Sequence, residues 1–354
     1  MSLRELADGR SVIVCCGAGG VGKTTSAAAV ALAAASLGRR VCVVTVDPAR
    51  RLADALGIGE ISDLARRVEG PWPGTLDAVM LDPASTFDRL VERYARDREQ
   101  VRHIFDNRIY KSLISTLSGT QEYMATERLY ELVDGGEYDL IVVDTPPSRD
   151  ALAFLAAPER LASFLDNRLF RLLVAPGKAS LRALSAAAQL FIRTIGRIAG
   201  REIVEDTMAF FRAFDGMEEG FRERAGAVGK LLRDEGTAYL LVTTPRREAL
   251  AEAAYLATHF GEAALGVSAV VVNRVTPDFG APFAAGSGAG DWAELVENLD
   301  ELVAQHRGER RALDELLGPL EGATVVELPL LSDDVHDLDT LGLLSRLLIG
   351  EALP

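Results

Sequence analysis

A glycine-rich loop between an apolar run and an alanine-rich run is the feature that most constrains this chain. The loop spans Gly17 to Thr25 and reads GAGGVGKTT. The apolar run before it, Val12–Cys16, is typical of a buried strand, and the run after it, Thr24–Leu37, predicts a helix. A strand, a G-x-x-x-x-G-K-[ST] loop and a helix in this order form the phosphate-binding P-loop.

The loop predicts how phosphates would be held. Glycines let successive backbone N–H groups turn toward one anion, and the start of the helix adds a partial positive charge. Lys23 would reach the β- and γ-phosphates, and the Thr24 hydroxyl would bind Mg²⁺. We therefore predict that a nucleoside triphosphate with magnesium binds to Gly17, Ala18, Gly19, Gly20, Val21, Gly22, Lys23, Thr24 and Thr25.

Short β-branched runs alternate with helical patterns along the chain, which indicates βαβ units and a mostly parallel sheet. We expect an α/β P-loop NTPase fold, with roughly seven to eight strands flanked by helices. The predicted strands are Val12–Cys16, Val41–Val46, Leu76–Leu81, Leu140–Asp144, Ala238–Thr243, Val267–Asn273 and Thr324–Glu327.

Two long stretches read as helical and interrupt this alternation. We interpret the chain as a single P-loop ATPase domain with a core of about 1–85, 133–157 and 234–354, and helical insertions of about 86–132 and 158–233. Apolar residues such as Leu161, Phe210 and Phe214 recur at helical spacing in the second insertion. They favour ordinary helix packing, and the alternative is a surface that binds an apolar client helix.

Two aspartates each close a predicted strand. Asp47 begins the sequence DPARR, and Asp144 begins DTPPS. In open parallel sheets, ligands bind at the carboxyl ends of the strands, where an aspartate beside a P-loop commonly orders Mg²⁺. The alternative is that each aspartate only caps the following helix.

The combination of GAGGVGKTT, TVDPARRLADALG, VVDTPPS and VVNR resembles the arsenite-pump and tail-anchored-protein targeting ATPases, an ArsA/Get-like family. This family belongs to the deviant P-loop group that includes ParA and MinD, and the sequence is most similar to its actinobacterial branch. The resemblance implies an ATP-binding, Mg²⁺-dependent ATPase that acts as a nucleotide-driven switch. It also implies a dimer and a hydrophobic protein client.

The resemblance assigns roles to individual residues. Asp47 matches the aspartate that polarises the attacking water, and Asp144 matches the aspartate near Mg²⁺. Asn273 matches an asparagine that binds adenine, and Pro329 lies where the family packs a loop against the base. These matches imply that the nucleotide is ATP or ADP.

One departure concerns the second loop position, where the deviant group carries a lysine and this chain has Ala18. A cation at a phosphoryl-transfer site can contribute several orders of magnitude in rate. Hydrolysis would therefore be slow, or Arg50, Arg51 or Arg149 would supply the charge. In a third version, a lysine-bearing paralogue supplies it in a heterodimer rather than a homodimer.

The cysteines argue against two family properties. The C-x-x-C pair that binds zinc in targeting members would fall within 276–291, which contains no cysteine, so we expect no zinc. The three cysteines, Cys15, Cys16 and Cys42, all precede the insertions, so an arsenite or anion efflux ATPase subunit is disfavoured. Unpaired cysteines in apolar runs favour a reducing, cytoplasmic setting.

Composition narrows the remaining classes. A net charge of −14 without a basic run argues against nucleic acid as a partner. Arginines interrupt the longest apolar segment, so we expect no membrane span. A ParA/MinD-like positioning or regulatory ATPase stays open, although the C-terminal residues lack a basic amphipathic helix. A phosphotransferase or ligase on a related fold is a further alternative, for which no acceptor-binding motif is evident.

Overall fold

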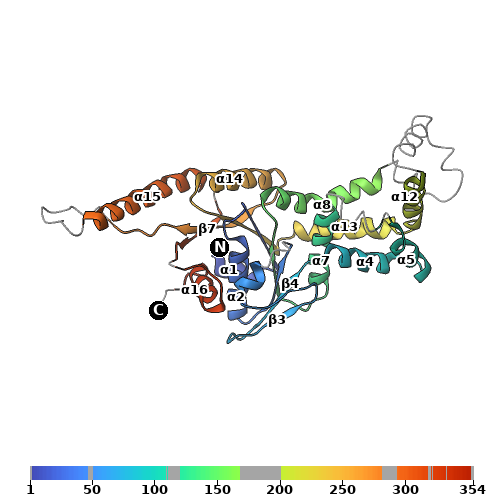
Figure 1. Cartoon of the computed structure of the whole chain (residues 1–354), viewed down its shortest axis with the longest axis horizontal. Coiled ribbons are helices and arrows are strands. Elements are labelled where there is room, and N and C mark those ends of the chain that lie inside the picture. The colour runs from blue at the N-terminus through green and yellow to red at the C-terminus, as the bar shows by residue number, and fades with distance from the viewer. Residues whose placement is uncertain are drawn as a thin grey trace. The chain divides into compact units, whose positions relative to one another are not determined.

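In the computed structural model, the chain forms an eight-stranded sheet and a separate cluster of helices (Figure 1). The described residues are 2–46, 51–108, 110, 120–167, 201–280, 293–317, 320, 322–331 and 333–351. The chain divides into two compact units. The sheet unit comprises Met1–Met80, Leu132–Leu152 and Glu235–Pro354, and the helical unit comprises Leu81–Glu131 and Ala153–Asp234.

The strands of the sheet unit have the order β3-β4-β2-β5-β1-β6-β7-β8. All neighbouring pairs are parallel except β3–β4. The predicted mostly parallel α/β fold is therefore confirmed. The strands are β1 Val12–Gly17, β2 Arg40–Thr45, β3 Arg66–Val68, β4 Thr75–Met80, β5 Leu140–Asp144, β6 Thr237–Thr243, β7 Val267–Val275 and β8 Thr324–Pro329.

The sequence analysis did not predict β3. This strand has only three residues, with the exposed Arg66 and Arg67 before the buried Val68. Such a pattern carries no periodic apolar signal. Its antiparallel pairing with β4, which places Arg67 opposite Asp77, comes from tertiary structure.

Helices cover both faces of the sheet. Along β1, Ile13 and Cys15 belong to the core that includes α1, α2 and α16, and the alternate residues are buried as well. On the second face, the Tyr239 ring of β6 lies 5.3 Å from the Phe260 ring of α14. The helices of this unit are α1 Leu3–Gly9, α2 Lys23–Ser36, α3 Arg51–Ala55, α14 Arg247–Glu262, α15 Ala293–Leu317 and α16 Leu338–Leu348.

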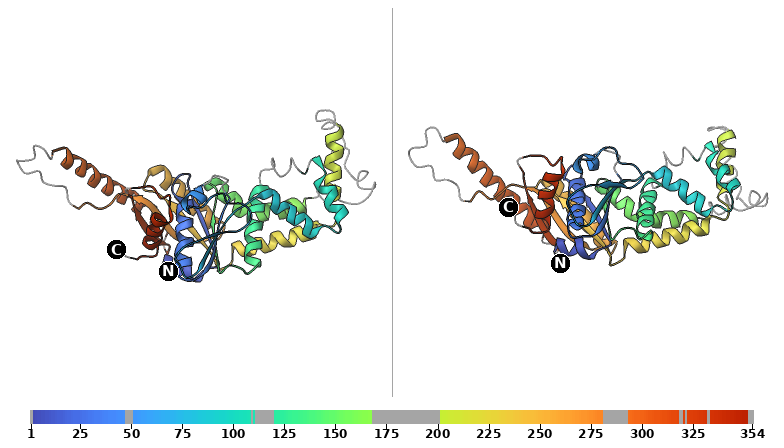
Figure 2. Two further views of the ribbon diagram at one scale, coloured as in Figure 1. Left: turned by 60° about the horizontal axis from the view of Figure 1, so that its bottom comes forward. Right: turned by 90° about the horizontal axis from the view of Figure 1, so that it is seen from below.

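The small side chains of α2 decide how this helix packs. All of its alanines are fully buried, because the helix lies between the sheet, α1 and α16 (Figures 1 and 2). Alanine favours helix and allows close approach of neighbouring backbones. The packing positions the start of α2 at the end of β1, so it also positions the loop between them.

The described part of the helical unit contains α4 Pro83–Tyr94, α5 Arg98–Phe105, α12 Arg201–Ala213 and α13 Glu218–Leu232, together with most of α7 Thr120–Asp134 and α8 Ser148–Asp166. Its core is rich in aromatic rings, including Phe87, Phe210, Phe214 and Phe221. The packing interpretation thus holds for Phe210 and Phe214. Pro158 lies inside α8 and does not begin a new segment.

A buried ion pair joins two helices of the helical unit. The Arg224 guanidinium of α13 donates from Nε to Oε1 of Glu127 on α7 at 2.6 Å, and the carboxylate side chain is fully buried. The same guanidinium lies 4.0 Å from the centre of the Tyr130 ring. Burial raises the pKa of Glu127, while Arg224 acts in the opposite direction. Removing either charge alone would therefore lower the free energy of unfolding, because the other charge would stay buried without a partner.

Candidate nucleotide site

Two glycines determine the shape of the loop between β1 and α2. A Cβ on Gly17 would lie 2.1 Å from the Val242 carbonyl oxygen, and a Cβ on Gly22 would lie 2.3 Å from Nδ2 of Asn273. Gly22 also has a φ of 96° and caps α2. Both distances are too short for a side chain, so this path of the loop requires glycine at both positions.

Lys23 is the first residue of α2, and only 8% of it is exposed. Its ammonium group donates to the Ala18 carbonyl at 2.7 Å, which closes the loop on itself. The pKa of Lys23 is lowered, mainly by burial and also by the positive charge of Arg51, while Asp144 and Cys16 act to raise it. An anion beside Lys23 would favour its charged form, as a phosphate group does.

Three oxygen-bearing side chains meet where β2, β5 and α2 come together. Oδ2 of Asp144 accepts a hydrogen bond from the Thr24 hydroxyl at 2.7 Å and another from the Thr45 hydroxyl at 3.1 Å. Asp144 is 1% exposed and Thr45 is 2% exposed. Thr45 pairs with Asp144 in the register of β2 and β5, so their side chains lie side by side.

These oxygens fit Mg²⁺, which prefers hydroxyl and carboxylate oxygen and keeps several waters when it binds beside phosphate. In the described ranges no cluster of three or more His, Cys, Asp or Glu side chains could hold a metal ion. A Mg²⁺ ion bound mainly by phosphate and water does not need such a cluster. Thr24 and Asp144 therefore suit the predicted metal role.

The two residues predicted to meet the base lie at the ends of neighbouring strands. Asn273 is near the end of β7, and its Nδ2 donates to the Val21 carbonyl of the loop at 2.9 Å. Pro329 ends β8, and its register partner is Val275. The N–H of Leu330 then donates to the Val275 carbonyl at 2.8 Å. Asn273 thus reaches the phosphate loop, and Pro329 lies one strand further along the sheet.

Several predicted residues lie outside the described part of the chain. These are Asp47, Arg50 and the side chain of Arg149. Arg51 is described: it begins α3, it is exposed, and its charge acts on Lys23. Ala18 is 6% exposed.

Thr45 was not among the predicted site residues. The available signal was a hydroxyl residue at the end of an otherwise apolar strand, two positions before Asp47. Only the register between β2 and β5 brings this hydroxyl to Asp144.

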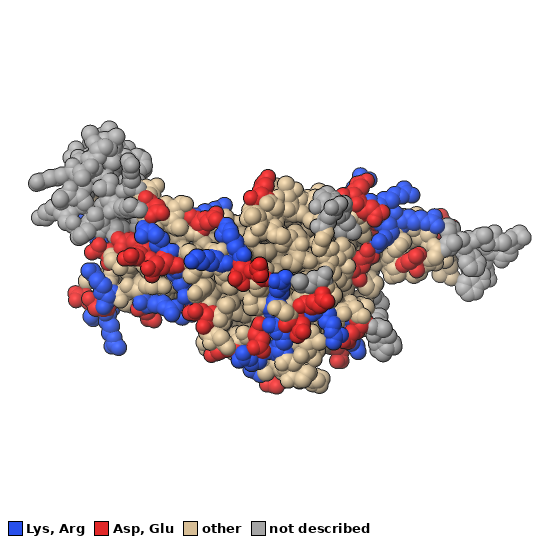
Figure 3. Space-filling model, turned by 180° about the vertical axis from the view of Figure 1, so that it is seen from behind, with Lys and Arg blue, Asp and Glu red and all other residues tan. Residues whose placement is uncertain are grey.

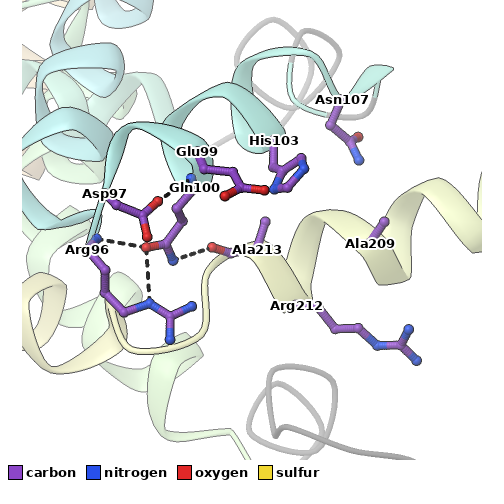
Figure 4. Close-up of a pocket in the computed structure, with 9 residues that line it drawn as sticks. All are labelled: Arg96, Asp97, Glu99, Gln100, His103, Asn107, Ala209, Arg212 and Ala213. Carbon is purple, nitrogen blue, oxygen red and sulfur yellow. Dashed lines mark hydrogen bonds between the residues drawn. The ribbon is translucent and has the colours of Figure 1, made fainter.

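A separate cavity of about 510 Å³ lies in the helical unit between α5 and α12 (Figure 4). Gln100 of α5 links the two sides of the cavity, because its amide nitrogen donates to the carbonyls of Ala213 and Asp215 at 2.7 and 3.1 Å. The lining is largely charged or polar and consists of Arg96, Asp97, Glu99, Gln100, His103, Asn107, Ala209, Arg212 and Ala213. This chemistry differs from that of the phosphate loop and does not suggest a second nucleotide site.

The surface charges of the described residues are mixed. Figure 3 shows acidic and basic side chains interspersed on this face, without a large area of one sign. None of the helices in the described ranges is long and apolar enough to cross a membrane.

The mostly parallel sheet and the glycine loop at the start of α2 define the chain as a P-loop NTPase. Comparison with protein families gives a more particular answer. The model of the anion-transporting ATPase family matches residues 10–350, so the chain belongs to this family.

Curated relatives agree with this assignment. The chain is 24% identical over 350 residues to a protein of Aquifex aeolicus named as arsenical pump-driving ATPase 1, with 97% of this chain and 80% of the relative covered. It is also 24% identical over 344 residues to the ATPase get3 of Aspergillus terreus, covering 96% and 90% of the two chains. A match to the ATPase GET3 of Malassezia globosa is 30% identical but covers 47% of this chain.

Proposed function

We propose that this ATPase hydrolyses ATP to ADP and phosphate at the β1–α2 loop, with Mg²⁺ held beside Thr24 and Asp144. The observation that carries the proposal is that a buried lysine, a hydroxyl and a carboxylate (Lys23, Thr24 and Asp144) lie together at the carboxyl ends of the central strands. Bound Mg²⁺ supplies charge that neutralises the phosphate oxygens. Lys23 supplies a second positive charge, and Asp47 would polarise the attacking water.

The orientation of Asn273 supports adenine as the base. A carbonyl only accepts hydrogen bonds, so the bond to Val21 identifies the group facing the loop as the amide nitrogen. The Asn273 oxygen then serves as the acceptor for a base. Adenine offers an exocyclic amine to such an acceptor, whereas guanine offers a carbonyl oxygen at the corresponding position.

Arg51 supports a version in which the missing loop lysine is replaced within one chain. Its charge is close enough to Lys23 to lower the pKa of that residue. A guanidinium near the phosphate site could stabilise charge in the transition state. A homodimer would then suffice, and the alternative remains a heterodimer whose other subunit contributes the lysine.

The proposed output is capture and release of a hydrophobic protein segment, driven by the nucleotide state. Support comes from the family resemblance and from the position of Thr45 and Asp144, each of which precedes a loop that could respond to the γ-phosphate. In the described part of the helical unit, Phe210 and Phe214 are buried, whereas Phe164 is 50% exposed. Phe164 is therefore the residue we would test first for contact with a client.

The central experiment compares Lys23→Ala with Lys230→Ala, which removes an exposed lysine of α13. We expect Lys23→Ala to reduce the ATPase rate by roughly 10²- to 10³-fold, because a preorganised charge at the phosphates is lost. Lys230→Ala should match the wild type. Equal rates for the wild type and Lys23→Ala would contradict the proposed site.

A second function, an ATPase coupled to arsenical or other anion transport, is favoured by the name of the Aquifex relative. None of the three cysteines forms a disulfide, but all are buried in β1 and β2, and burial raises the pKa of Cys15 and Cys16. Buried protonated thiols are poor ligands for a metalloid. In the same ATPase assay we therefore expect stimulation by an apolar helical peptide and none by arsenite; the reverse result would favour the transport function.

A further inference from the structure

Thr45 forms part of the surroundings of Asp144, although nothing in the P-loop motif requires it. Its hydroxyl is 3.1 Å from Oδ2 of Asp144, the same oxygen that Thr24 contacts at 2.7 Å. The backbone adds a second link between the ends of β2 and β5, because the Val46 N–H donates to the Asp144 carbonyl at 3.3 Å. The end of β2 is thus joined to Asp144 through both side chain and main chain.

The hydroxyls of Thr24 and Thr45 would have different roles when a metal ion is bound. A hydroxyl that ligates a cation uses an oxygen lone pair, so the geometry of Thr24 must satisfy both the metal and Asp144. Thr45 belongs to β2 and not to the phosphate loop, so its hydrogen bond is independent of that demand. A hydrogen bond to a carboxylate is worth more than one between neutral groups, and a buried one restrains the orientation of the carboxylate.

We propose that Thr45 is a positioning residue for magnesium, which holds the Asp144 carboxylate toward the water shell of the ion and ties it to the strand that leads to Asp47. The inference rests on the proposed ATP site. The inference adds a residue of β2 to those that determine how much Mg²⁺ increases the affinity for ATP. Thr45 acts through Asp144 and does not itself touch nucleotide or metal.

This role predicts a magnesium-specific defect. Thr45→Val keeps the size and β-branching of the side chain and removes the donor. We expect it to reduce by roughly 10- to 100-fold the gain in ATP affinity that Mg²⁺ provides, since a hydrogen bond to a charged group is lost. Affinity for metal-free ATP, measured in the presence of a chelator, should change by less than about twofold. Thr45→Ser keeps the hydroxyl and should retain most of the magnesium response.

The measurement is the dissociation constant of a fluorescent ATP analogue with and without Mg²⁺, on the full chain. Thr126→Val is the matched control, because Thr126 is fully buried and its hydroxyl donates to the Tyr123 carbonyl at 2.8 Å, inside the helical unit. This control should show the magnesium gain of the wild type. Circular dichroism establishes that each variant is folded.

The outcomes separate this inference from the proposed function. If the wild type binds ATP no better with Mg²⁺, the proposed site is wrong. If the wild type gains affinity and Thr45→Val gains equally, or loses affinity equally with and without metal, only the role of Thr45 is overturned. Should Thr45→Val not fold, Thr45→Ala and Thr45→Ser replace it, and equal magnesium gains in these two would overturn the role.

Discussion

The phosphate loop of the sheet unit and the core of the helical unit hold buried charge in different ways. In the sheet unit, Lys23 and Asp144 are held by neutral partners, a backbone carbonyl and two hydroxyls. In the helical unit, Glu127 and Arg224 neutralise each other directly at 2.6 Å. Charges that remain paired with neutral groups can still respond to a charged ligand, whereas an ion pair already satisfies both members. We interpret the first arrangement as a binding site and the second as an ion pair that stabilises the helical unit.

The largest expected effect concerns the buried ion pair of Glu127 and Arg224. Arg224→Met leaves Glu127 buried without its cation, so we expect a loss of about 3–5 kcal/mol in unfolding free energy. Urea denaturation, combined with hydrogen exchange of α7 and α13, measures it. Replacing both partners, Glu127→Leu with Arg224→Met, should recover most of the loss.

Arg222→Met is the control on the same helix. Arg222 pairs with Asp166 at 3.3 Å, but the two side chains are 39% and 54% exposed. An exposed pair contributes at most about 1 kcal/mol, so this variant should be close to wild type. Similar losses for Arg222→Met and Arg224→Met would show that the buried pair contributes no more to stability than the exposed one.

A smaller effect is expected from Asn273→Asp in the sheet unit. The substitution places a carboxylate oxygen against the Val21 carbonyl, where the amide now donates at 2.9 Å. A lost hydrogen bond that leaves an acceptor unsatisfied costs about 1–3 kcal/mol, which is roughly a 5- to 150-fold weaker affinity for ATP. Preference for ATP over GTP should also decrease, as measured by titration with each nucleotide.

Asn107→Asp provides the matched change in the helical unit. The Asn107 amide also donates to a main-chain carbonyl, that of Asp206, at 3.0 Å. We expect no change in nucleotide affinity, because this bond belongs to the cavity between α5 and α12. Weaker ATP binding in Asn107→Asp would show that the sheet unit does not hold the nucleotide alone.

The smallest effect concerns pH and Lys23. The pKa of Lys23 is lowered from its ordinary value of 10.5, so the empty site loses this positive charge at a lower pH than a free lysine would. ATP favours the protonated form, and affinity should therefore decline as the pH rises through the lowered pKa. Arg51→Ala removes a charge that lowers this pKa and should move the decline to higher pH, as followed in an alkaline titration series. A decline that Arg51→Ala leaves in place would show that Arg51 does not act on Lys23.

Local patterns were sufficient to predict much of the sheet unit. The apolar runs and the glycine loop predicted β1 and α2, because a P-loop is contiguous in sequence and depends on local backbone shape. The same holds for the aspartate that closes β5. The roles of Lys23 and Thr24 in binding phosphate and Mg²⁺ stay predictions. The family assignment followed from four short motifs and was confirmed over residues 10–350.

Tertiary structure decided what depends on register and on long-range pairing. No spacing in the sequence shows that Thr45 lies beside Asp144, 99 residues away, or that Asn273 reaches the Val21 carbonyl, 252 residues away. The same applies to the pair of Glu127 and Arg224. Periodicity indicates which face of an element is buried, whereas the partner across that face is determined by strand order and helix packing. The sequence alone therefore predicted the phosphate loop, and only the folded chain showed which hydroxyl and amide groups surround it.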